Sequence, residues 1–70
     1  MDPKMLAELN QQIMEETYSA YIYHAMAADL EHKGYKGMAT WMRVQAREEK
    51  IHADIFYNFI LERGEKVELW

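Results

Sequence analysis

The chain has no cysteine, one proline and three glycines among its 70 residues. Without cysteine it forms no disulfide, and a reducing compartment such as the cytoplasm is its expected location. No apolar run approaches the roughly 20 residues that span a bilayer, and the first residues show no signal-peptide pattern. The formal net charge is −4 and no block of Lys or Arg occurs, so we expect neither a nucleic acid nor a membrane as partner.

Hydrophobic residues, in contrast, make up 50% of the chain. The hydrophobic core of such a short chain seldom contributes more than about 3–5 kcal/mol to folding stability, so small chains usually need a metal, a disulfide or a partner. Two helices cannot enclose so many large side chains, and the surplus apolar surface predicts oligomerisation.

The rare glycines and the single proline divide the chain into two helical segments. Asp2 and Pro3 are typical of an N-cap and a first helical position, and Gly34 and Gly64 are typical of residues just past a helix. A short connection between long helices makes them antiparallel, so the predicted fold is an all-α helical hairpin forming one domain. The predicted segments are a helix over about 3–33, a loop at 34–37, a helix over about 38–63 and a tail at 64–70, which forms a short strand or packs on a neighbour.

Each predicted helix has an apolar stripe at steps of three and four residues, and polar residues interrupt both stripes. Glu16 interrupts the first stripe, and Glu49 and His52 interrupt the second. These three side chains are expected to point into the middle of the hairpin, where an unpaired carboxylate costs several kcal/mol or loses its charge. The stripes comprise positions 6, 9, 13, 16, 20, 23, 27 and 30, and positions 38, 42, 45, 49, 52, 56 and 59.

The three polar residues are expected to meet. At about 1.5 Å per residue from the loop, Glu16 lies roughly 25 Å along its helix and the Glu49/His52 pair roughly 18–23 Å along the other. Carboxylates and a neutral imidazole are ligands for Fe, Mn or Zn, so a metal ion would compensate them. Two other interpretations stay open: the glutamates lie on a solvated face, and His52 is a core histidine bonded to a carbonyl.

One hairpin supplies only half of a familiar ligand set. Four-helix di-iron proteins use one Glu from each of two helices and Glu-x-x-His from each of the other two. A twofold dimer of this chain would supply two copies each of Glu16, Glu49 and His52. The missing ligands and the surplus apolar surface therefore both predict a homodimer, or a higher oligomer, built on a four-helix bundle.

Two long stretches resemble a known family. The segments LNQQIMEETYSAYIYHAMA (9–27) and GYKGMATWMRVQAREEKIHADIFYNFILERGEKVEL (34–69) are similar to the first two helices of prokaryotic non-haem ferritins. This resemblance implies a ferritin-like bundle with a ferroxidase centre whose iron ligands match Glu16, Glu49 and His52. It also implies a tyrosine beside the centre, matched by Tyr23, and an accessory iron ligand in some members, matched by Glu48. A seam-filling aromatic and a solvated charge are the alternative interpretations of these two residues.

The chain also departs from the family pattern. A ferritin subunit has four long helices, and this chain corresponds to the first half, as in the two-helix ferritin-like proteins carried inside encapsulin shells. Haem-binding bacterioferritins have methionine directly after the second-helix Glu, whereas this chain has Lys50, so the resemblance implies no haem at that site.

Three functions are therefore weighed. The first is a ferroxidase that oxidises Fe(II) with O2 or peroxide, for iron storage or detoxification. The second is a helical dimer that holds Zn, Mn or Fe structurally without turnover. The third is peroxide reduction of the rubrerythrin kind, for which the chain lacks the Cys-ligated iron centre. We favour the first function, mainly on the resemblance.

The remaining features are expected to be structural. The six methionines are interpreted as adaptable core rather than as a haem or copper site. A further apolar stripe beside the ligands could close the bundle or bind another dimer; it comprises Trp41, Val44, Ile51 and Ile55. His24 lies one residue off the seam and is interpreted as surface or interface rather than as an extra ligand.

Overall fold

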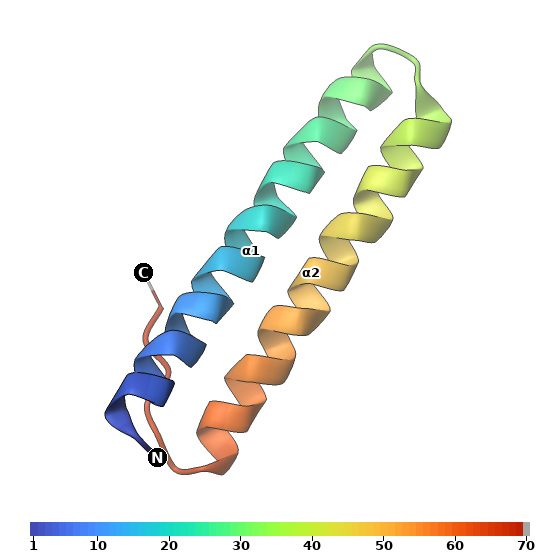
Figure 1. Cartoon of the computed structure of the whole chain (residues 1–70). Helices are drawn as coiled ribbons and strands as arrows, with labels where there is room; N and C mark the ends of the chain where they lie inside the picture. Colours follow the sequence, from blue (N-terminus) through green and yellow to red (C-terminus); the bar gives the residue numbers. More distant parts are fainter. Residues whose placement is uncertain (70) are drawn as a thin grey trace.

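Two antiparallel helices form the whole regular structure of residues 1–69, the part of the chain that the computed structural model describes. Helix α1 spans Pro3–His32 and helix α2 spans Lys36–Glu62, and they lie side by side in a rod of 47 × 17 × 13 Å (Figure 1). The all-α hairpin expected from the sequence is thus the observed architecture. Helix α2 begins two residues earlier than the sequence pattern indicated, so only residues 33–35 connect the helices.

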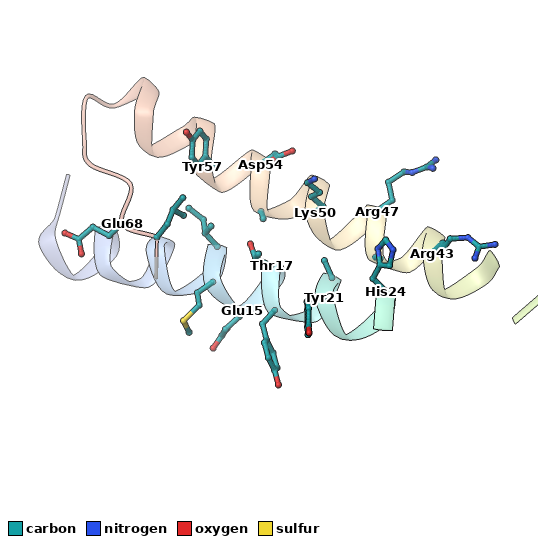
Figure 2. Close-up of a pocket in the computed structure, with 17 residues that line it drawn as sticks. Glu15, Thr17, Tyr21, His24, Arg43, Arg47, Lys50, Asp54, Tyr57 and Glu68 are labelled. Carbon is teal, nitrogen blue, oxygen red and sulfur yellow. The ribbon is translucent and has the colours of Figure 1, made fainter. Parts of the chain in front are cut away.

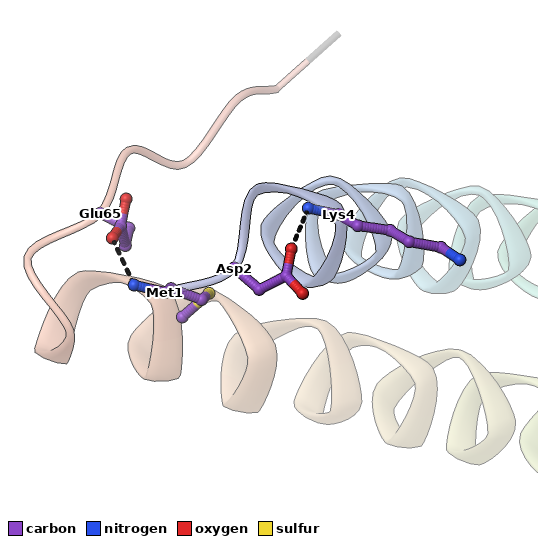
Figure 3. A network of polar contacts seen from close by, with 4 residues as sticks. All are labelled: Met1, Asp2, Lys4 and Glu65. Carbon is purple, nitrogen blue, oxygen red and sulfur yellow. Dashed lines mark hydrogen bonds and ion pairs between the residues drawn. The ribbon is translucent and has the colours of Figure 1, made fainter.

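Local signals explain where α1 begins and where both helices end. The Asp2 carboxylate caps α1 by accepting a hydrogen bond from the Lys4 amide at 2.9 Å (Figure 3), and Pro3 needs no such partner because it has no N–H group. After each helix a glycine adopts positive φ, +89° at Gly34 and +72° at Gly64, where a side chain would be strained.

On α2, the seam between the helices is formed by three alanines and one isoleucine. Ala39, Ala46, Ala53 and Ile60 recur every seven residues and are all buried, as are Ile13 and Ala27 of α1. Small side chains at this spacing let the two helices approach closely. The stripe predicted for α2 therefore lies beside the seam rather than on it: Met38 and His52 are exposed, and the other predicted positions are half-buried.

The tail runs back along the first turns of α1 (Figure 1) and is held by one buried side chain. The Asn10 amide donates to the carbonyl of Lys66 at 3.4 Å, and its oxygen accepts from the amide of Glu68 at 2.8 Å. Val67 packs against a core cluster formed by Ile13, Ala53 and Ile60. The N-terminal amine pairs with Glu65 at 3.3 Å (Figure 3). Within residues 64–69 the tail forms no strand and packs on its own chain; Trp70 lies outside the described residues.

Much apolar surface is left uncovered by the two helices. Neither described helix is long and apolar enough to cross a membrane. The exposed large side chains include Ile22, Met26, Met38, Trp41, Val44, Ile51 and Ile55. This distribution agrees with the surplus expected from composition, because a two-helix hairpin has only one internal seam.

We predict that Asn10→Ala releases the tail. The variant would leave the amide of Glu68 and the carbonyl of Lys66 without their partner, at a cost of about 1–3 kcal/mol. Amide hydrogen exchange measured by NMR should show Glu68 exchanging as fast as free backbone, while the adjacent exposed variant Gln11→Ala leaves it protected. A Glu68 amide that stays protected in Asn10→Ala would contradict this assignment.

Candidate metal centre

Three potential ligands converge at the middle of the hairpin. Glu16 comes from α1, and Glu49 and His52 come from α2, one helical turn apart. Each offers one ligand atom, and these atoms all lie within 4.8 Å of one another. His52 Nδ1 lies 3.6 Å from Glu16 Oε2. The structure therefore brings together the three residues that interrupt the apolar stripes.

The cluster lies at the edge of the seam rather than inside the hairpin. The Glu16 side chain is only 16% exposed, but that of His52 is 52% exposed, and Glu49 is half-buried. The expectation that all three point into the hairpin is thus wrong for His52. The small residues of α2 occupy the seam, so the polar residues face the side on which the hairpin is open.

The two carboxyl groups perturb each other. A hydrogen bond from Glu49 is the main cause that lowers the pKa of Glu16, with a further contribution from Gln12, against partial burial that raises it. The same bond to Glu16, together with desolvation and the negative charge of Glu16, raises the pKa of Glu49. The opposite directions of the two pKa shifts follow from the closeness of two like-charged groups, because adjacent carboxylates repel each other.

Gln12 belongs to this site, although the sequence analysis missed it. Its side-chain amide donates a hydrogen bond to Glu16 Oε1 at 2.9 Å. The signal was present in the sequence, because a Gln four residues before a Glu lies beside it on a helix. The polar residue is half-buried at the edge of the cluster.

The other sequence candidates lie at differing distances from the cluster. Tyr23 is half-buried on α1, two turns beyond Glu16. Glu48 is exposed, yet its charge contributes to raising the pKa of Glu49. His24 is exposed and lines a separate hollow on another side of the hairpin, so it does not join the three ligands.

A hollow of about 1340 Å³ lies on another side of the hairpin (Figure 2). None of the three clustered ligands lines it. Basic residues from α2 and aromatic residues from both helices line it, and Glu68 and Leu69 of the tail border it. The lining includes Tyr18, Tyr21, His24, Arg43, Arg47, Lys50, Asp54 and Tyr57. Lys50 follows Glu49 directly and is therefore turned about 100° from it around the helix axis.

The donor set fits a divalent metal. Two carboxylates and one imidazole suit Fe, Mn or Zn, and each residue already directs one donor atom into a common space. A cation bound between the two carboxylates would offset their mutual repulsion, because metal ligands of this kind bind in their deprotonated form. Three donors do not complete a two-metal centre, so the geometry supplies half of one.

Comparison with known proteins gives the family. The family described as a ferritin-like domain matches residues 6–69. The chain belongs to the ferritin-like family. The bacterial non-heme ferritin of Staphylococcus epidermidis is 38% identical over 65 residues, which cover 93% of this chain and 39% of that protein. The bacterial non-heme ferritin of Staphylococcus aureus is 37% identical over 68 residues, covering 97% of this chain and 41% of that protein.

Solved ferritin structures share the fold of this hairpin. An open-pore ferritin from the hyperthermophilic archaeon Archaeoglobus fulgidus superposes with a TM-score of 0.94 and 46% sequence identity, over 100% of this chain and 43% of that one. The chain thus spans about two fifths of the length of the ferritins that it matches. The resemblance to ferritins seen in the sequence is therefore confirmed for the helical hairpin.

We predict that Glu49→Gln stabilises the metal-free chain at pH 7. The raised pKa of Glu49 means that its stabilising contribution is present below about pH 4.3, the ordinary glutamate value, and is lost as pH rises through the folded-state pKa. The amide removes that loss, and we expect a gain of roughly 0.2–1 kcal/mol, the scale of exposed charge interactions.

Thermal unfolding in the presence of a chelator, repeated from pH 3.5 to about pH 8, measures this effect. The gain should shrink as the pH falls, and Glu15→Gln, on the exposed neighbour of Glu16, should show no such trend. Equal curves for Glu49→Gln and Glu15→Gln would show that the carboxyl pair does not interact.

Proposed function

We propose that this chain binds iron as a ferritin-like protein and oxidises Fe(II) to Fe(III) at a di-iron centre. The observation that supports this most is the convergence of Glu16, Glu49 and His52 within 4.8 Å, in a chain of the ferritin-like family. The matched relatives are non-heme ferritins by name, which supports iron storage or detoxification as the wider role.

Two copies of the chain would complete the centre. Di-iron four-helix proteins take one Glu from each of two helices and Glu-x-x-His from each of the other two, and a twofold dimer supplies that set from identical chains. Exposed or half-buried apolar side chains lie beside the seam where the second copy would dock. They include Met38, Met42, Phe56 and Phe59, and a hollow there is lined by Ile22, Met26 and Leu30 together with the two methionines.

The chemistry requires only electron transfer from the bound substrate to an oxidant. Two Fe(II) ions give up one electron each, and O2 takes up both electrons with two protons to form H2O2; with H2O2 as oxidant, the products are two waters. Carboxylates stabilise the higher charge of the Fe(III) product, since they are anionic oxygen donors. Tyr23 and Glu48 would support this reaction, Tyr23 beside the centre and Glu48 at an accessory iron position.

A structural role for the metal is the alternative function. The same donors suit Zn or Mn, and Zn has no redox chemistry that O2 could drive. A dimer that folds equally well around Zn, without consuming oxygen when Fe(II) is offered, would have this function instead.

We predict that the chain binds about two Fe(II) per dimer and oxidises them rapidly. Anaerobic Fe(II) titration gives the stoichiometry, and rapid mixing with O2, followed by ultraviolet absorbance and oxygen uptake, gives the oxidation step. Both should be lost in Glu49→Ala, because each half of the centre loses one of its three ligands.

The matched control is Glu15→Ala, which removes an exposed carboxylate next to Glu16. It should keep both the stoichiometry and the fast oxidation. Fe(II) that binds without oxygen uptake in the unmodified chain would favour the structural function, and equal losses in both variants would mean that the clustered ligands are not the site.

A further inference from the structure

The carboxylate of Glu16 has a different partner on each oxygen. Gln12 Nε2 donates to Oε1 at 2.9 Å, while Oε2 lies 3.6 Å from His52 Nδ1. The amide nitrogen must face the carboxylate, because an ionised carboxylate only accepts hydrogen bonds. One oxygen is therefore fixed by α1 itself, and the other is directed toward α2.

A second Gln–Glu pair on α1 has the same spacing but lies outside the ligand cluster. Gln11 and Glu15 have the same four-residue spacing, one position earlier on α1. Their side chains are exposed, and the distance from Gln11 Nε2 to Glu15 Oε1 is 3.5 Å, at the limit of a hydrogen bond. Of these two contacts, the one at the candidate metal centre is the shorter and is partly buried.

We propose that Gln12 is a positioning residue for the metal ligands. It holds Oε1 of Glu16 so that Oε2 points to the space shared with Glu49 and His52. This inference rests on the proposed function, because it assigns Gln12 a role toward the metal that those residues would bind. Gln12 is not itself a ligand through the nitrogen that donates, since that nitrogen has no free lone pair.

Residues that do not touch the metal can still affect how tightly it binds. Outer residues that hydrogen-bond a ligand fix its orientation, and replacing them typically weakens metal binding about 10–100-fold. A glutamate has three side-chain torsions, so a carboxylate without its hydrogen-bond partner swings among several directions. Gln12 is half-buried on the side where a second copy would dock, and exclusion of water there would strengthen the bond.

The experiment compares Gln12→Met with Gln11→Met in the full chain. Methionine has nearly the same length and helix propensity as glutamine but donates no hydrogen bond. Anaerobic titration with Co(II), followed by its visible absorption, reports both affinity and ligand geometry. We expect Gln12→Met to bind Co(II) about 10–100-fold more weakly, with an altered absorption band, and Gln11→Met to match the unmodified chain.

Two further measurements separate positioning from folding. The mass in solution and the helical content of the metal-free protein should be the same in both variants. In metal-free protein, NMR should place the side-chain amide protons of Gln12 downfield of those of Gln11. Similar amide shifts for the two glutamines would contradict the hydrogen bond on which the role depends.

The outcomes distinguish this inference from the proposed function. If the unmodified chain binds Co(II) and Gln12→Met binds it equally well with an unchanged band, the positioning role is overturned and the metal site stands. If the unmodified chain binds neither Co(II) nor Fe(II), the proposed function is overturned. The positioning role of Gln12 is then overturned as well.

Discussion

The constraint on which this molecule depends is the placement of two carboxylates and an imidazole beside an apolar seam. Glu16 and Glu49 lie close enough to shift each other's pKa in opposite directions, so the metal-free chain holds two like-charged groups side by side. Such an arrangement opposes folding unless a cation or a proton compensates it. It is therefore a cost to stability that a metal site explains and a purely structural hairpin does not, as is common where function and stability compete.

Close helix packing and tail contacts help to stabilise this small hairpin. Alanines every seven residues on α2 let the helices pack closely, and buried Asn10 holds the tail against α1. These contacts do not cover the apolar side chains on the open side of the hairpin. The same side bears the metal ligands, so a second copy docked there would both cover the apolar side chains and complete the ligand set.

Much of this architecture could be predicted from the sequence, for identifiable reasons. Asp2, Pro3 and Gly34 mark helix ends through backbone rules that act locally, and Glu16 stood out because it interrupts a periodic apolar stripe. The alanine seam was missed because alanine is weakly apolar and the larger residues beside it dominate the pattern. The Asn10 contact with the tail joins residues 58 apart in the chain, which no local rule indicates. The exposure of His52 depends on how the helices rotate against each other, which helical spacing alone leaves open.

Native mass spectrometry of the metal-loaded chain shows whether two copies share one centre. We expect a dimer that holds two metal ions and that dissociates more readily when a chelator removes them. A monomer that holds one metal ion as tightly as any dimer, or a dimer whose mass shows no bound metal at saturating Fe(II) or Co(II), would contradict it.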